Sequence, residues 1–177
     1  PGFIHVPHND LNALENILKN EKDVVSFLFE PIQGEAGVNV PDDNYIKGVR
    51  DLCSRYNVLM IADEIQTGLG RTGSLLASCG HCSCSSSCEK QDSYVRADIL
   101  ILAKALSGGT YPISAVLCDS EIMEVIQPGQ HGSTYGGNPF AASIAKKSLE
   151  ILIEEKLPQN AKKLGEIFRS KINDYIK

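Results

Sequence analysis

The stretch "VLMIADE" (58–64) decides the fold, because five apolar residues run without interruption into the carboxylates Asp63 and Glu64. A short continuous apolar run is typical of a strand that is covered on both faces, as in parallel sheets. Three more segments have the same character, namely "VVSFLFEP" (24–31), "ADILILAK" (97–104) and "PISAVLC" (112–118). We expect all of these segments to be strands.

Helical patterns separate these strands. Asn9 or Asp10 can cap a helix that carries Leu11, Leu14, Ile17 and Leu18 at helical spacing, and "DDNYIKGVRDLCSRYN" (42–57) has a second apolar face. Further helical patterns cover about 119–126, 139–155 and 157–176, the last two meeting near Leu157-Pro158. Strands that alternate with helices predict an α/β domain with a mainly parallel sheet and flanking helices.

Composition excludes several classes of protein. With 42% apolar and 22% charged residues the 177-residue chain is ordinary for a globular domain, and a net charge of -5 argues against a nucleic-acid platform. No apolar run approaches the roughly 20 residues that span a bilayer. The first residues show no targeting signal and no initiator Met. We expect an incomplete chain from a cytoplasmic protein, with the mitochondrial matrix as the alternative.

Gly68, Gly70 and Gly73 fit the G-x-G-x-x-G pattern of a dinucleotide site. That site needs its first glycine directly after the strand and a helix after the third. Here residues 64–67 intervene, and a short Leu-Leu-Ala leads into a Cys- and Ser-rich stretch instead of a helix. Asp92, at about the distance of a ribose-binding acid, lies inside that polar stretch. The pattern therefore disfavours a dinucleotide.

The first polar residues after the strands are Glu30, Asp63 and Lys104, and parallel sheets bind ligands at this edge. A lysine amine that leaves a buried strand is expected to be desolvated, with a lowered pKa, which suits Schiff-base chemistry. Pyridoxal phosphate needs such a lysine, a carboxylate for its ring nitrogen and donors for its phosphate. Asp63 is placed for the nitrogen, and Gln66 for the ring hydroxyl.

The loop "HGSTYGGNP" (131–139) precedes a helix and is suited to the phosphate through Ser133 and Thr134. Each of these features also has a simpler interpretation. A strand-end Asp is often a turn former, a strand-end Lys is usually solvated, and Ser or Thr before a helix is usually only a cap. His131 is better explained by loop structure than as a general base.

Four blocks in order carry a family resemblance: "EPIQGEAGV" (30–38), "IADEIQTGLGRTG" (61–73), "KALSGGTYPISAVL" (104–117) and "PGQHGSTYGGNP" (128–139). The chain resembles the class-III, fold-type-I aminotransferases that depend on pyridoxal phosphate, above all their ornithine-specific branch. The resemblance implies that residues 1–155 belong to the large cofactor domain, with 78–93 as an insertion. It also implies that 156–177 form a helix leading into a small C-terminal domain.

The resemblance also implies roles. Lys104 bonds to the cofactor and later moves the proton, Asp63 pairs with the ring nitrogen, and Gln66 contacts the ring hydroxyl. Thr134, with Ser133 beside it, contacts the phosphate in the neighbouring subunit, which implies a homodimer with shared sites. In the ornithine and γ-aminobutyrate branch Glu35 masks an arginine, so that one site accepts two substrates; Glu30 supports it.

The implied reaction belongs to amino-acid metabolism and proline biosynthesis. The δ-amino group of L-ornithine passes to 2-oxoglutarate, giving glutamate 5-semialdehyde and glutamate. The alternatives are N-acetylornithine or γ-aminobutyrate as the donor, or an inactive fragment with a metal- or thiol-binding loop. The family's glycine-rich phosphate cup and its substrate-binding arginine lie upstream of residue 1, and the arginine that pairs with Glu35 lies downstream of Lys177. We expect the chain alone to be inactive.

The Cys- and Ser-rich stretch holds Cys79, Cys82, Cys84 and Cys88, with His81 among them. It makes the segment between Asp63 and Lys104 longer than in the family. A structureless insertion, a redox-responsive loop and a zinc site are the three interpretations, and we favour the first, with no metal. Deletion of residues 79–90 from a full-length version should leave transamination intact. Cys53 and Cys118 are expected to be small buried hydrophobes.

Overall fold

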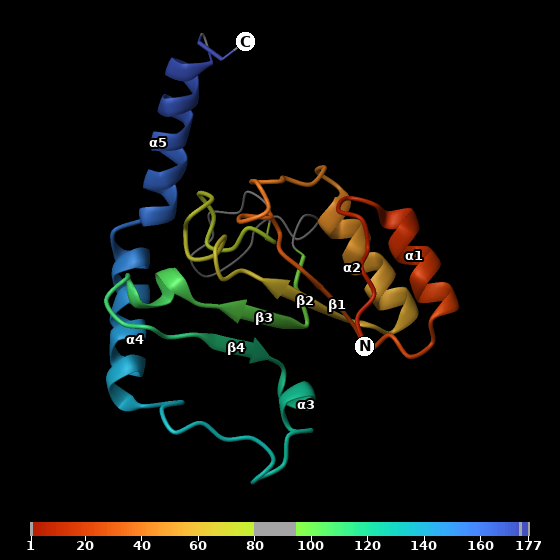
Figure 1. Ribbon diagram of the computed structural model, residues 1–177. Helices are drawn as coiled ribbons and strands as arrows, with labels where there is room; N and C mark the ends of the chain where they lie inside the picture. The colour runs from red at the N-terminus through yellow and green to blue at the C-terminus, as the bar shows by residue number, and fades with distance from the viewer. Residues whose placement is uncertain (1, 80–94, 174, 177) are drawn as a thin grey trace.

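A four-stranded sheet forms the centre of the computed structural model, which describes residues 2–79, 95–173, 175 and 176 (Figure 1). The strands are β1 (Ser26–Phe29), β2 (Leu59–Asp63), β3 (Ile99–Leu102) and β4 (Ala115–Cys118), and they lie side by side in that order. β1, β2 and β3 are parallel, and β4 runs antiparallel to β3. The predicted α/β class with a mainly parallel sheet is confirmed.

Two helices, α1 (Leu11–Asn20) and α2 (Tyr45–Tyr56), pack on each other and on the β1–β2 side of the sheet. Asp10 caps α1, because its Oδ1 accepts a hydrogen bond of 2.9 Å from the Ala13 amide. α2 ends at Tyr56, because the next residue, Asn57, has a left-handed backbone (φ 55°) that stops the helix. Their apolar faces enclose a core that contains Leu14, Leu18, Val49, Leu52, Cys53 and Met60.

The expectation that β2 is covered on both faces is wrong for the described residues. Met60 and Ala62 are fully buried, but Leu59, Ile61 and Asp63 on the opposite face are only half-buried. Leu28, which pairs with Ile61 in the sheet register, is 55% exposed. The cause is that α1 and α2 pack on one face only, so the face that carries Asp63 stays open.

A second core lies where β3 leads into the 3-10 helix η2 (Lys104–Ser107). The helix α4 (Pro139–Glu154) packs on η2 and contributes Ala145 and Leu152, which meet Leu102 and Leu106. Asn138 caps α4 through its side chain, which accepts a hydrogen bond from the Ala141 amide. α4 therefore fixes the segment that follows Lys104.

The remaining helices are shorter than the sequence pattern predicts. α3 covers Ser120–Met123 instead of 119–126, and no side chain caps its start. α5 (Leu157–Ile172) begins directly after Lys156, which has a left-handed backbone (φ 52°), and it extends away from the sheet (Figure 1). In the part of the chain that the structure describes, no helix combines the length and apolar character needed to cross a membrane.

Candidate active site

Asp63 and Lys104 leave the sheet at the same edge. Asp63 is the last residue of β2, and it pairs in register with Ile101 of the neighbouring parallel strand β3. Lys104 follows the end of β3 by two residues and begins η2. The carboxyl ends of adjacent parallel strands thus present a carboxylate and an amine together, as the sequence predicts.

The Lys104 amine donates a hydrogen bond to Oε1 of Gln66. Lys104 has a left-handed backbone (φ 45°), a conformation that is uncommon for a residue with a side chain and that recurs at functional sites. The predicted desolvation of this amine is wrong for the described residues, because Lys104 is exposed. The reason is the open face of the sheet, on which no other segment of the described chain covers the amine.

Among the residues that the structure describes, only one of the two carboxylate oxygens of Asp63 is bonded to protein. Its Oδ1 accepts a hydrogen bond of 3.0 Å from the Ile65 amide, two residues further along. Within residues 2–79 and 95–173, Oδ2 has no hydrogen bond to protein. The first bond fixes the orientation of the carboxylate, and the second oxygen can then pair with a cationic group.

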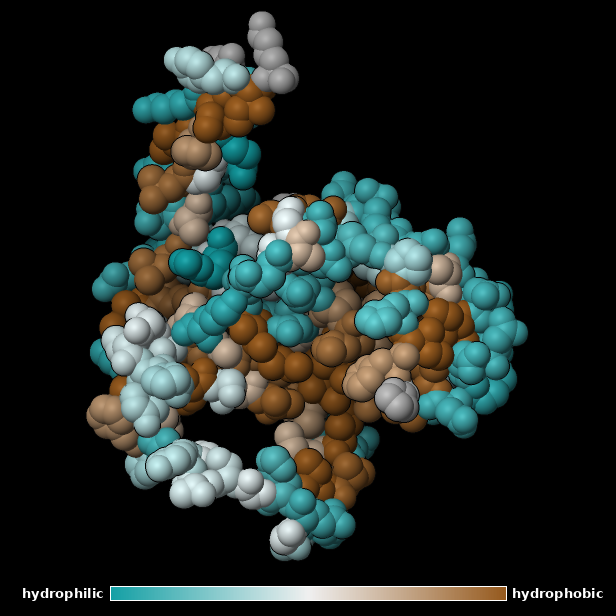
Figure 2. All heavy atoms as spheres, in the orientation of Figure 1, coloured by the Kyte–Doolittle hydropathy of each residue, from teal (hydrophilic) through white to brown (hydrophobic). Residues whose placement is uncertain are grey.

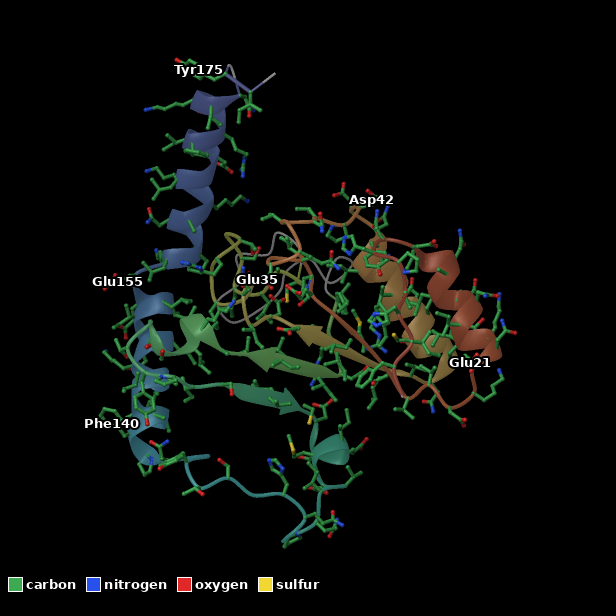
Figure 3. The ribbon with its side chains drawn as sticks, in the orientation of Figure 1. Glu21, Glu35, Asp42, Phe140, Glu155 and Tyr175 are labelled. Carbon is green, nitrogen blue, oxygen red and sulfur yellow. The ribbon has the colours of Figure 1, made fainter. Side chains whose placement is uncertain are left out.

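Gln66 lies against the loop 30–39. A Cβ atom placed on Gly34 would stand only 2.5 Å from Nε2 of Gln66, so the two residues are in close contact. Oε2 of Glu30 accepts a hydrogen bond of 3.1 Å from the Gly34 amide and holds this loop in place. Glu35, the next residue, is exposed, and Figure 3 shows it in the loop near the ends of β2 and β3. The loop thus brings Glu30 and Glu35 to the same edge as Lys104.

Ser133 and Thr134 do not lie with Lys104 at the strand ends. Both are exposed in the loop before α4, and Oγ of Ser133 accepts a hydrogen bond of 2.9 Å from the Gly136 amide. Figure 3 shows Phe140, at the start of α4, far from Glu35. His131 is also exposed in this loop.

The G-x-G-x-x-G stretch packs against protein. A Cβ on Gly70 would stand 3.2 Å from Cγ of Pro158, and one on Gly73 would stand 2.9 Å from Cβ of Lys162. Both partners belong to α5, and both glycines have positive φ values of 90°. Gly70 and Gly73 therefore allow a tight loop and let α5 pack closely against its backbone. This explains the motif without a dinucleotide.

Glu64 also lies at this edge, and its role was not predicted from the sequence. It is 1% exposed, and its carboxylate accepts hydrogen bonds from the Thr67 hydroxyl (2.6 Å) and from the amides of Ala77 (3.1 Å) and Ser78 (2.7 Å). Side chains alternate between the two faces of a strand, so Glu64 points away from the face of Asp63. This alternation of side chains along the strand is the feature of the sequence that could have indicated different roles for Asp63 and Glu64.

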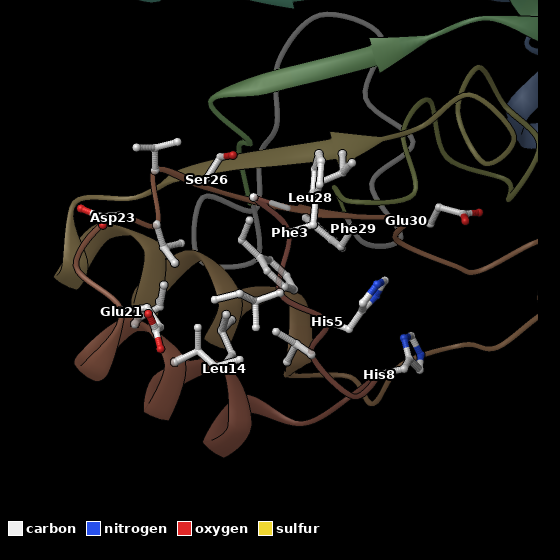
Figure 4. Close-up of a pocket in the computed structure, with 18 of the residues that line it drawn as sticks. Phe3, His5, His8, Leu14, Glu21, Asp23, Ser26, Leu28, Phe29 and Glu30 are labelled. Carbon is white, nitrogen blue, oxygen red and sulfur yellow. The ribbon is translucent and has the colours of Figure 1, made fainter.

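A pocket of about 610 Å³ lies apart from Lys104, between β1 and the segment that precedes α1 (Figure 4). Its lining includes Gly2–Val6, the α1 residues Leu14, Ile17 and Leu18, and the consecutive residues Asp23–Glu30. None of Asp63, Gln66 and Lys104 contributes to it. It does not belong to the group at the strand ends.

The described cysteines form no metal site. Cys53 is fully buried, as predicted, whereas Cys118 is only half-buried. Cys79 is half-buried, and Cys82, Cys84, Cys88 and His81, like Asp92, lie outside the described residues. Among the described ranges, no group of three or more His, Cys, Asp or Glu side chains could hold a metal ion.

An amine and a carboxylate at adjacent strand ends, with an amide on the amine, are the groups used by enzymes that bind an aldehyde cofactor through lysine. Residues 4–177 match the family described as aminotransferase class-III, and the chain belongs to that family. The curated ornithine aminotransferase of Plasmodium yoelii yoelii is 55% identical over all 177 residues of the chain.

Solved structures agree with this assignment. The Toxoplasma gondii ornithine aminotransferase, reported with partial occupancy of PLP at its active site, is 46% identical over 98% of the chain and 38% of its own length (TM-score 0.88). An acetylornithine aminotransferase from Elizabethkingia anophelis is 52% identical over 99% of the chain and 43% of its own length (TM-score 0.88). The chain spans about 40% of the length of the curated relatives it matches.

Proposed function

We propose that the protein to which this chain belongs is a pyridoxal-phosphate-dependent aminotransferase. It transfers the δ-amino group of L-ornithine to 2-oxoglutarate, giving glutamate 5-semialdehyde and glutamate. The observation that carries the proposal is that Asp63 and Lys104 leave adjacent parallel strands at one sheet edge, with the Gln66 amide hydrogen-bonded to the Lys104 amine. Family membership supports the cofactor, because class-III aminotransferases depend on it.

The residues present fit pyridoxal phosphate. This cofactor, when bound, supplies an aldehyde for amines and a ring that withdraws electrons from the substrate carbon. Oδ2 of Asp63 would hold the ring nitrogen protonated, and the amide of Gln66 would donate to the ring hydroxyl. The exposed Lys104 amine would accept the proton from the substrate carbon and return it one step later.

Two observations favour ornithine as the amino donor. The ornithine aminotransferases are among the most similar relatives, and Glu35 lies in the loop next to Gln66, where it can select substrate. The second candidate donor is N-acetylornithine, because the acetylornithine aminotransferase is 52% identical to the chain, as close as the ornithine enzymes. The donors differ in one acetyl group, so one experiment separates them.

The proposal includes a homodimer with shared sites. Ser133 and Thr134 are exposed on the loop before α4, and in Figure 1 this loop and η2, which begins at Lys104, lie at opposite ends of α4. In a dimer this loop would reach the cofactor phosphate of the other subunit with its hydroxyls and amides. Residues 1–155 would belong to the large domain, and α5 would lead into the small one.

For the compartment, we propose the mitochondrion, the second of the two locations predicted from the sequence. Curated relatives from rat and Caenorhabditis elegans carry mitochondrial in their names. Fractionation of source cells, with an antibody against this chain, tests the proposal. Recovery of the protein in the cytosolic fraction alone would contradict it.

An amino-donor screen on the complete protein tests the function. Purified enzyme with pyridoxal phosphate and 2-oxoglutarate is given ornithine, N-acetylornithine or γ-aminobutyrate, and glutamate formation is measured. We expect the highest kcat/KM for ornithine and loss of turnover in Lys104→Ala. A preference for N-acetylornithine would reassign the donor, and full activity of Lys104→Ala would refute the aminotransferase site.

A further inference from the structure

We propose that Glu64 is a positioning residue for the cofactor site: its buried carboxylate sets the turn that carries Gln66. The inference rests on the proposed function, because it assigns Gln66 to the cofactor. Glu64 itself faces away from Asp63 and touches no reacting group. Its effect passes through the five-residue turn 64–68.

The turn is closed by both the backbone and the side chain of Glu64. The Gly68 amide donates to the backbone oxygen of Glu64 (2.9 Å), and the Thr67 hydroxyl donates to Oε2 (2.6 Å). A Cβ on Gly68 would stand 2.8 Å from the same backbone oxygen, so the turn is as tight as glycine allows. Gln66 lies in the middle of this turn, next to Thr67.

The same carboxylate also fixes the segment that returns from the glycine loop. Oε1 accepts from the Ser78 amide (2.7 Å), and Oε2 accepts from the Ala77 amide (3.1 Å). Glu64 thereby joins the start and the end of the loop 65–78 at one point. Without this link, the turn would keep the Ile65–Asp63 hydrogen bond and the Gly68–Glu64 backbone bond, but nothing from the Glu64 side chain would tie it to residues 77 and 78.

Burial of the Glu64 carboxylate is energetically unfavourable, which argues that this side chain has a specific role. A buried carboxylate pays a large desolvation penalty unless hydrogen bonds offset it. Within residues 2–79 and 95–173 Glu64 forms no salt bridge, and its partners are one hydroxyl and two amides. Such a network fixes geometry, because each donor must keep its place.

The far end of β2 offers a matched control. Asp98 is another carboxylate that holds this strand, since its Oδ2 accepts from the Met60 amide (2.6 Å) and from Arg50 (2.8 Å). It lies at the amino end of the strand, away from Gln66. If Glu64 only stabilises the fold, substitution of either carboxylate should have the same consequences.

The test compares Glu64→Gln with Asp98→Asn in the complete protein after removal of the cofactor. Equilibrium dialysis against pyridoxal phosphate gives the Kd, and thermal unfolding gives the stability. Gln offers one acceptor oxygen and adds a donor that opposes the amides, so we expect Glu64→Gln to raise the Kd about tenfold, or ~1.4 kcal/mol. Asp98→Asn should lower the Tm and change the Kd less than about twofold, because its strand end does not hold Gln66.

A double-mutant cycle separates positioning from general destabilisation. In a Gln66→Ala background, Glu64→Gln should change the Kd less than about twofold, because the residue that it positions is gone. An unchanged effect in that background, or equal effects of Glu64→Gln and Asp98→Asn, would overturn the proposal. If Glu64→Gln does not fold, Thr67→Val replaces it, with an expected rise of about threefold from the loss of one hydrogen bond. Failure of the unsubstituted protein to bind pyridoxal phosphate would refute the proposed function instead.

Discussion

At the scale of single residues, the position of Gln66 depends on Gly34. The space between them has no room for a methyl group, since a Cβ on Gly34 would meet the Gln66 amide at 2.5 Å. Gly34 has no positive φ, so its identity is explained by this contact and not by its backbone. The contact at Gly34 therefore joins two segments, the loop that carries Glu30 and Glu35 and the turn that carries Gln66.

Gly34→Ala should displace the Gln66 side chain and raise the Kd for pyridoxal phosphate about three- to tenfold, because the clash meets a flexible side chain that can move. Equilibrium dialysis of the complete protein measures this. The control is Gln66→Ala, in whose background Gly34→Ala should have no further effect. An equal rise in both backgrounds would show that Gly34 acts on some other part of the site.

Cys53 should resist thiol reagents at neutral pH. It is fully buried in the α1–α2 core, and burial raises the pKa of its thiol to about 11 by disfavouring the thiolate, with Asp98 adding to the rise and Arg50 opposing it. We expect slow modification by iodoacetamide at pH 8, measured by peptide mass spectrometry, and faster modification of the half-buried Cys118. Equal rates for the two cysteines would contradict this.

The same thiol gives a pH dependence of stability. Its folded pKa of about 11 lies above the ordinary thiol value of 9.0, so the folded state keeps the proton that the unfolded state releases. The contribution of Cys53 is therefore intact below pH 9 and is lost as the pH rises from 9 toward 11. Unfolding curves of Cys53→Ala should show a smaller loss of stability across this window than curves of the unsubstituted protein.

At the scale of elements, the glycine loop and α5 form one packed unit. Gly73→Ala would place a Cβ 2.9 Å from Cβ of Lys162 on a backbone with φ 90°, which a side chain rarely adopts. We expect a loss of about 1–3 kcal/mol in the free energy of unfolding, measured by denaturant titration. Gly165→Ala, within α5 and without a close contact, should instead be neutral or stabilise by up to about 1 kcal/mol. A neutral Gly73→Ala would contradict the packing.

The elements themselves could be predicted from the sequence. Apolar runs located the four strands of the described sheet within a few residues, and the capping candidates Asn9 and Asp10 located the start of α1, which Asp10 caps, because burial and capping leave local patterns. The emergence of Asp63 and Lys104 at one edge also followed, since parallel strands align their ends. The exposure of Lys104 and the packing of Gly70 and Gly73 could not be predicted from the sequence, because they depend on segments distant in the chain.

The antiparallel direction of β4 also could not be predicted from the local apolar pattern of the sequence. "PISAVLC" is as apolar as the parallel strands, and strand direction is set by the connection through η2 and by α4. The different roles of Asp63 and Glu64 were accessible in principle, because alternation puts them on opposite faces. The partners of Glu64 were not, since Ala77 and Ser78 return from the far side of a loop.

At the scale of the whole molecule, two apolar surfaces stand out. The open face of the sheet exposes Leu28 and Val116, and α5 exposes Leu164 and Phe168. Figure 2 shows apolar atoms, in brown, around the sheet and along α5 on the viewed side. Apolar surface of this kind marks contacts with other protein.

The isolated 177-residue chain should therefore bind the dye ANS and self-associate. Leu28→Lys together with Val116→Lys should lower the ANS fluorescence at least about twofold, because both side chains lie on the open face. Fluorescence titration and size-exclusion chromatography measure the two effects. A monomeric chain without dye binding would show that these surfaces are covered in another way.

The most direct test of the central claim is the covalent attachment of the cofactor. The complete protein is incubated with pyridoxal phosphate, reduced with borohydride and digested, and the modified peptide is identified by mass spectrometry. We predict a single stoichiometric modification at Lys104, with loss of the visible absorption band on reduction and no band in Lys104→Ala. Modification of another lysine at full stoichiometry, or an unchanged band in Lys104→Ala, would contradict the account.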